Sequence, residues 1–184
     1  MSSALKQRLA LDAATEVFCR YGFHRTTMGD IAQQAGMSRP ALYLLFPDKD
    51  AVFTAVVRHM DEAKRAEISD EIASVSGLRA KLLRACVSWG CHGVDLAAVH
   101  PDAADLFDLS FPVVREVYQN FQSFVAELIA AQPRRSQIEA GPEELARTLV
   151  YSLRGLRATA ADGVEMRRLI AVLVDVFVRA IEAG

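Results

Sequence analysis

Hydrophobic residues recur at spacings of three and four along most of the chain, which is the periodicity of amphipathic helices. The pattern is strongest after Pro112, where apolar residues follow one side of a helix through Ile129. No segment shows the strict alternation that is typical of half-buried strands. The sequence therefore predicts an all-α protein, with helices over residues 5–23, 48–74 and 78–99, a short helix from Pro101, long helices from Pro112 and Pro142, and a last helix over 164–184. Residues 132–142 are predicted to form the clearest loop.

The last predicted helix is apolar on more than one side. Between Leu169 and Ile181 only Asp175 and Arg179 are charged. A helix needs one apolar stripe to cover its own core, so a wider apolar surface requires a second buried contact. The last two helices could form a four-helix bundle with a second copy of the chain. The alternative is that the last helix lies in the centre of a monomeric core.

Local signals between Thr26 and Asp50 predict two short helices joined by a tight turn. Thr27 can cap the first helix, with Asp30 completing a capping box. Gly36 suits the left-handed conformation that ends a helix. Ser38 can cap the second helix, and Pro40 is tolerated in its first turn. This is the layout of a helix-turn-helix, whose second helix enters the major groove of DNA.

Leu42 and Phe46 are four residues apart, so we expect them to anchor the second helix to the rest of the domain. Asp48 is expected to cap the next helix, which places Lys49 in its first turn. A cation there opposes the helix dipole, and the position makes sense if the lysine binds a phosphate. The alternative is an ordinary exposed lysine.

Residues 5–53 resemble the N-terminal domain of the tetracycline-repressor (TetR) family of bacterial transcription regulators. The matching elements are LKQRLALDAATEVFCRYGF, TTM, DIAQQAGMSRPALY and FPDK. The resemblance implies a three-helix DNA-binding head, a linking helix, and a C-terminal helical domain that dimerises and often holds a small ligand. The implied DNA-binding residues are Thr26, Thr27, Ser38, Arg39, Pro40, Ala41, Tyr43, Leu44 and Lys49. Leu45 departs from the family pattern, in which histidine or tyrosine is common, and it puts one phosphate contact in doubt.

Charge and composition refine this interpretation. The chain of 184 residues carries a formal net charge of −2, but residues 1–50 hold six basic and five acidic residues. Such a weakly basic head suggests that specific binding depends on two heads in a dimer, spaced to match a palindromic operator. No apolar run reaches the length of a membrane span, and the N-terminus lacks a signal peptide, so we expect a cytoplasmic protein. The predicted domains are residues 1–50, which bind DNA, and residues 51–184, which dimerise and bind a ligand.

An unidentified small-molecule effector is expected in the C-terminal domain. Gly90 and Gly93 weaken their helix and can leave room for a molecule beside Trp89. The alternative is an ordinary aromatic core with a glycine packing seam. The candidate ligand-binding residues are Cys86, Trp89, His92, Phe107, Phe111, Tyr118, Phe121 and Tyr151.

Catalysis, a metal site and a cofactor are not expected. Cys86, Cys91, His92, Asp95 and His100 lie near one another in sequence, but they do not follow a recognisable zinc spacing. Two hypotheses remain. The first is a homodimeric transcription regulator, a repressor released from its operator by a small ligand. The second is a helical ligand-binding or adaptor protein with a degenerate DNA-binding head.

Overall fold

The computed structural model describes residues 3–132 and 139–182, and every regular element within these residues is a helix. The all-α prediction is thus confirmed. The elements are α1 (Ser3–Arg25), α2 (Met28–Gln34), α3 (Arg39–Tyr43), α4 (Lys49–Ala73), α5 (Leu78–Val99), the 3-10 helix η1 (Pro101–Phe107), α6 (Pro112–Ala130), α7 (Pro142–Thr159) and α8 (Gly163–Glu182). Residues 133–138, which fall in the predicted loop 132–142, lie outside the described residues.

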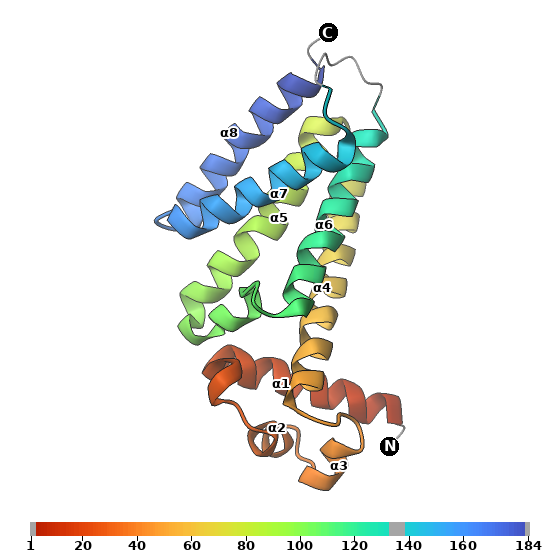
Figure 1. Ribbon diagram of the computed structural model, residues 1–184, viewed down its shortest axis with the longest axis vertical. Coiled ribbons are helices and arrows are strands. Elements are labelled where there is room, and N and C mark those ends of the chain that lie inside the picture. Colours follow the sequence, from red (N-terminus) through yellow and green to blue (C-terminus); the bar gives the residue numbers. More distant parts are fainter. Residues whose placement is uncertain (1–2, 133–138, 183–184) are drawn as a thin grey trace. The chain divides into compact units, whose positions relative to one another are not determined.

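The contacts between helices divide the chain into two compact units. The head unit comprises Met1–Ala63 and Leu96–Val117, and the second unit comprises Lys64–Asp95 and Tyr118–Gly184. The predicted domain boundary falls after residue 50, at the end of the DNA-binding segment. In the structure, the unit that contains this segment also includes the first part of α4, η1 and the start of α6. Figure 1 shows α1, α2 and α3 gathered beside the first turns of α4.

Phenylalanine side chains form the centre of the head unit. Phe18 meets Phe53 edge to face, with ring centroids 5.3 Å apart, and Phe23 lies 4.9 Å from Phe53. Phe111, which directly precedes α6, packs 4.7 Å from Phe53 and 5.0 Å from Phe23. Each large buried side chain stabilises a fold by roughly 1.5–3 kcal/mol. A residue far along the chain therefore completes the core of the N-terminal head.

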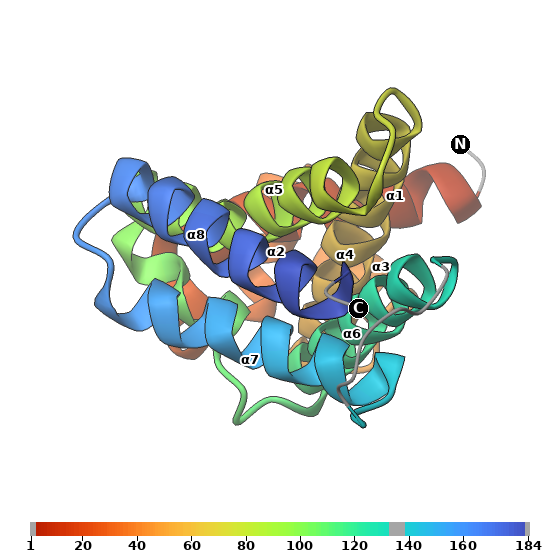
Figure 2. The same ribbon diagram turned by 90° about the horizontal axis from the view of Figure 1, so that it is seen from above.

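In the second unit, α7 and α8 run side by side (Figure 2). One stripe of α8 is buried at spacings of three and four residues, and Leu149 and Leu153 of α7 are buried as well. The buried residues of α8 are Met166, Ile170, Val174, Val178 and Ile181.

The opposite side of α8 is also apolar. Val172 is 57% exposed and Val176 is 60% exposed. Leu169, Leu173 and Phe177 are half-buried between the two sides. The two-sided apolar character predicted for this helix is therefore present, and its second side faces away from the unit's own core.

Candidate DNA-binding surface

A complete capping box fixes the start of α2. The Thr27 hydroxyl accepts from the Asp30 amide at 3.3 Å, and the Asp30 carboxylate accepts from the Thr27 amide at 2.8 Å. The Thr27 hydroxyl also donates to Asp30 at 2.7 Å. The hydrogen bond from the Thr27 hydroxyl, and after it the one from the Thr27 amide, lowers the pKa of Asp30. The positive charge of nearby Arg39 makes a smaller contribution in the same direction. The predicted cap is confirmed.

A glycine turn and a second cap then place α3. Gly36 has a φ of 62°, the left-handed conformation expected at this position. The Ser38 hydroxyl accepts from the Ala41 amide at 3.3 Å, as expected for an N-cap. Leu42 and Phe46 are buried and hold the helix against the head, so both anchors are confirmed.

The remaining residues of α3, together with Leu44 directly after its last residue, form an outward-facing surface. Leu44 is 88% exposed and Tyr43 is 52% exposed, although both are large and carry apolar surface. Arg39 and Pro40 are exposed beside them, and Ala41 is half-buried. Exposed bulky side chains on a rigidly anchored helix indicate a binding surface. We call these five residues, Arg39, Pro40, Ala41, Tyr43 and Leu44, the α3 face.

The two threonines before α2 lie in different environments. Thr27 is exposed, whereas Thr26 is only 1% exposed and its hydroxyl donates to the Gly22 carbonyl at 2.7 Å. The phosphate contact that the family resemblance implied for Thr26 does not fit this placement, because its side chain is inside the head. Thr27 remains a candidate for a backbone-phosphate contact.

Lys49 has a partner within the protein. Its ammonium group donates to the Phe23 carbonyl at 2.8 Å and lies 4.2 Å from the centre of the Phe23 ring. Asp48 caps α4 through a 2.7 Å bond from the Ala51 amide. The contact with Phe23 gives a second reason for a lysine at this helix start. Phosphate binding by Lys49 stays a prediction, and so does the effect of Leu45, which is half-buried.

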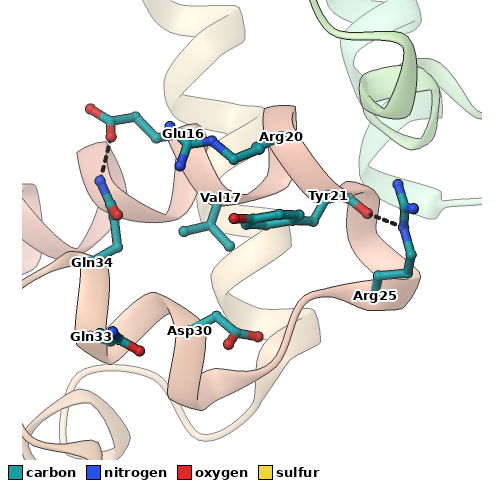
Figure 3. Close-up of a pocket in the computed structure, with 8 residues that line it drawn as sticks. All are labelled: Glu16, Val17, Arg20, Tyr21, Arg25, Asp30, Gln33 and Gln34. Atoms are coloured by element: carbon teal, nitrogen blue, oxygen red, sulfur yellow. Dashed lines mark hydrogen bonds between the residues drawn. The ribbon is translucent and has the colours of Figure 1, made fainter.

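A groove of about 460 Å³ lies between α1 and α2 in the head. Figure 3 shows the Tyr21 ring near its centre, with Arg20 and Glu16 on one side and Asp30 on the other. Several of its polar groups already have partners. Gln34 donates to Glu16 at 2.6 Å, Arg25 donates to the Tyr21 carbonyl at 3.0 Å, and Asp30 belongs to the capping box. The groove contains none of the predicted effector-binding residues.

Part of the predicted effector site does come together in the second unit. Trp89 stacks on Phe121 with ring centroids 4.4 Å apart and planes 3° apart, and Tyr118 meets Trp89 edge to face at 4.9 Å. Cys86 is buried and His92 half-buried on the same helix as Trp89. Burial, followed by the charges of Lys64 and Arg157, lowers the pKa of His92. Burial raises the pKa of the Cys86 thiol to about 12.

Three of the predicted effector residues lie elsewhere. Phe111 belongs to the phenylalanine core of the head unit, and Phe107 is the last residue of η1 in that same unit. Tyr151 is 49% exposed on α7. Effector binding by these three residues stays a prediction, because aromatic composition alone does not show which core or surface a ring joins.

The two glycines of α5 provide room for protein atoms. A side chain at Gly90 would meet Ile170 of α8 at 3.0 Å, and one at Gly93 would meet the Arg157 guanidinium at 3.0 Å. Arg157 lies over the Trp89 ring at 5.4 Å and donates to the Tyr118 hydroxyl at 3.4 Å. The room that the two glycines leave is thus occupied by Ile170 and Arg157. The contact with Arg157 had no signal in the sequence, because this residue is 68 positions away from Trp89 on another helix.

The described residues contain no group of three His, Cys, Asp or Glu side chains that could hold a metal ion. Within the same residues, no helix combines the length and the apolar character of a membrane span.

The anchored α3 face behind a capped α2 defines the class of the protein as a helix-turn-helix DNA-binding regulator. Residues 10–56 match the model of the bacterial regulatory proteins of the tetR family. Over 186 aligned positions, the chain is 30% identical to the HTH-type transcriptional repressor Rv1474c of Mycobacterium tuberculosis, covering 92% of this chain and 90% of that protein. The chain therefore belongs to the tetR family of bacterial regulatory proteins.

Two further proteins are similar to the chain, one in sequence over a short segment and one in structure over most of the chain. The HTH-type transcriptional regulator RutR of Escherichia coli is 40% identical over 55 residues, which cover 30% of this chain and 26% of RutR. The fatty acid degradation regulator FadR from Bacillus halodurans superposes with a TM-score of 0.75 at 16% identity, covering 95% of this chain and 96% of that one. The structural likeness shows a shared fold. The relatives are transcriptional regulators, which favours the regulator hypothesis over the adaptor hypothesis.

Proposed function

We propose that the protein is a homodimeric repressor that binds a palindromic DNA operator through the α3 face and leaves it when a small molecule binds the second unit. Arg39, Pro40, Ala41 and Leu44 contact base edges, and Tyr43, Thr27 and Lys49 contact the DNA backbone. Ser38 remains a predicted DNA-binding residue because it is exposed at the start of α3, although its hydroxyl also caps that helix. A protein that acts on DNA in bacteria works in the cytoplasm.

The observation that carries this proposal is the exposure of Tyr43 and Leu44 on a helix whose other side is firmly buried. Leu42 and Phe46 cannot turn outward without losing their packing, so the α3 face is presented in one orientation. Arg39 at the start of the same helix supplies a guanidinium that can bind guanine in a bidentate manner.

The DNA contacts can be tested on an operator selected from random DNA by the purified protein. Substitution Arg39→Ala should weaken specific binding by about 1–3 kcal/mol and relax the preference at one base position. Tyr43→Ala should weaken binding to specific and non-specific DNA alike. Tyr21→Ala is the matched control, because Tyr21 is also an exposed tyrosine of the head but lies in the α1–α2 groove. Equal affinities for the wild type and both α3-face variants would overturn the proposed contacts.

We place the dimer contact on α7 and α8. The exposed valines of α8 and exposed Tyr151 of α7 supply apolar surface that a second copy can cover. Val172→Glu combined with Val176→Glu should convert the dimer to a monomer in sedimentation experiments and weaken operator binding. Val99→Glu is the control, because Val99 is a more exposed valine, at 71%, and belongs to the head unit rather than to α7 or α8. A wild-type protein that binds its operator as a monomer would contradict this assignment.

We place the effector beside Trp89, Tyr118, Phe121, Cys86 and His92 in the second unit. Rings and a nearby guanidinium suit a ligand that has both an apolar body and a polar group. Trp89 is the single tryptophan of the chain, so its fluorescence reports on this cluster. A molecule that releases the protein from DNA should change Trp89 fluorescence at the same concentrations. Release without any fluorescence change would place the effector elsewhere.

A further inference from the structure

A carboxylate of η1, that of Asp105, binds the end of α1, which leads into the helix-turn-helix. The Phe23 amide donates to the Asp105 carboxylate at 2.7 Å, although the two residues are 82 positions apart. Arg25 forms an ion pair with Asp102 of the same short helix. These contacts, all within the head unit, join η1 to the end of α1 immediately before α2.

The hydrogen bond to Asp105 orients a single peptide group, the one between Gly22 and Phe23. Gly22 interrupts the helical conformation of α1 with φ 72° and ψ 172°, and this ψ sets the orientation of the peptide between Gly22 and Phe23. The N–H of that peptide donates to Asp105, and its carbonyl accepts from the Thr26 hydroxyl at 2.7 Å. Both polar groups of the peptide are therefore fixed, one by η1 and the other by the residue that precedes Thr27.

The next carbonyl extends the connection to α4. The Phe23 carbonyl accepts from Lys49 at 2.8 Å, so the orientation of this segment also sets the start of α4. The close approach depends on the absence of a side chain at Gly22. A Cβ there would lie 2.8 Å from the Asp102 carbonyl oxygen and 2.9 Å from an Asp105 carboxylate oxygen.

We propose that Asp105 is a positioning residue for DNA binding, which orients the Gly22–Phe23 peptide and thereby the beginnings of α2 and α4. Asp105 acts through Thr26, Phe23 and Lys49. The α3 face and Thr27 then make the DNA contacts, so this inference rests on the proposed function. Hydrogen bonds to an ionised group are stronger than neutral ones, and this bond is half-buried.

The test compares three substitutions of Asp105 on the full-length protein and the selected operator. Asp105→Ala removes the acceptor and should weaken operator binding by about tenfold, the factor that corresponds to the lower end of the free energy of a charge-assisted hydrogen bond. Asp105→Asn keeps an acceptor oxygen and should restore most of the affinity. Asp105→Glu keeps the charge but displaces the acceptor, and it should bind less tightly than Asp105→Asn. If the alanine variant does not fold, the comparison of Asn with Glu still decides.

Two controls separate positioning from charge and from stability. The Asp108 carboxylate, just after η1, is exposed and accepts from the Ser110 amide at 2.8 Å. Asp108→Asn removes its charge and keeps an acceptor oxygen, so it should leave affinity unchanged or raise it slightly, because one negative charge fewer repels DNA less. The amide proton resonance of Phe23 should move in Asp105→Ala and return toward the wild-type position in Asp105→Asn. A merely structural role would lower the unfolding temperature without changing affinity where every variant is folded.

The outcomes distinguish this inference from the proposed DNA contacts. If Arg39→Ala weakens operator binding but Asp105→Ala does not, the positioning role is wrong and the α3 face stands. If neither Arg39→Ala nor Asp105→Ala weakens operator binding, the proposed DNA contacts of the α3 face are wrong, and the positioning role that rests on them falls with them. If Asp105→Ala and Asp108→Asn raise the affinity by the same factor, the loss of one negative charge explains both results and the positioning role is wrong.

Discussion

The side chain of Arg39, at the start of α3, occupies the space that a side chain at Gly29 in α2 would take. A Cβ at Gly29 would overlap the Arg39 guanidinium. The absence of a side chain at position 29 therefore lets the arginine lie against the backbone of α2, near Asp30. The planar group therefore rests against α2 in the free protein, in a space that exists only because residue 29 is a glycine.

Gly29→Ala should displace Arg39 and weaken operator binding. Alanine is favoured over glycine within a helix by up to about 1 kcal/mol, so the variant head should be no less stable than the wild type. Operator affinity and thermal unfolding measured together test this expectation. Arg39→Ala in the Gly29→Ala background should add little further loss, and full additivity of the two changes would show that they are unrelated.

Gly22→Ala should destabilise the head more than Gly36→Ala. Both glycines have positive φ values, 72° and 62°, so both variants carry a backbone cost of about 1–2 kcal/mol or more. With ψ at 172°, Gly22 also lies in a region that essentially only glycine adopts. The new methyl group at position 22 also meets the Asp102 carbonyl, whereas nothing lies within 4 Å at position 36. Chemical denaturation of the two variants measures the difference, and equal losses would argue against a close approach of η1 to α1.

Thr27→Ala should lower the free energy of unfolding by about 1 kcal/mol, the usual cost of removing an N-cap. Thr27→Ser keeps the hydroxyl and should stay near the wild type. Because the folded-state pKa of Asp30 is lowered, its contribution is complete above the ordinary value of 3.8 and is lost as the pH falls through the folded pKa. The stability difference between wild type and Thr27→Ala should therefore shrink in strong acid, and a constant difference would contradict the role of Asp30.

His92 should make the protein less stable as the pH falls from 8 to 5. Its folded-state pKa lies below the ordinary value of 6.5, so the unfolded chain takes up the proton first. Stability is complete above about 6.5 and decreases as the pH falls toward the folded pKa. His92→Gln should flatten this part of the profile in denaturation experiments. A profile identical in wild type and variant would exclude His92 as the source.

Cys86 should resist alkylation in the folded protein. Its pKa of about 12 leaves almost no thiolate at pH 8, and the side chain is fully buried. Mass spectrometry of peptides after treatment with iodoacetamide should show Cys86 modified only after denaturant is added. Rapid modification under native conditions would indicate that the second unit opens readily around α5.

The sequence predicted the parts of the fold that depend on neighbouring residues. Thr27 with Asp30 and Ser38 with Pro40 are local signals, and the structure has both caps where they were predicted. The buried state of Thr26 and the bond between Lys49 and Phe23 involve partners that only the folded chain brings together. Family resemblance assigned both residues to DNA and could not show these internal contacts.

The predicted effector residues illustrate the same limit. Trp89, Tyr118 and Phe121 assemble, because α5 and α6 each present an apolar stripe to the second unit. Phe111 was predicted for the same site, but it packs against Phe53 in the head. Asp105 had no local signal at all, since its partner Phe23 is 82 positions earlier.

The packing of Phe111 and Asp105 into the head has a consequence for synthesis on the ribosome. Domains generally fold as units as the chain emerges. A nascent chain that ends near residue 63 already holds the whole helix-turn-helix, but it lacks the ring that fills the phenylalanine core and the carboxylate that binds the Phe23 amide. The DNA-binding head is thus completed only after more than half of the polypeptide has been translated.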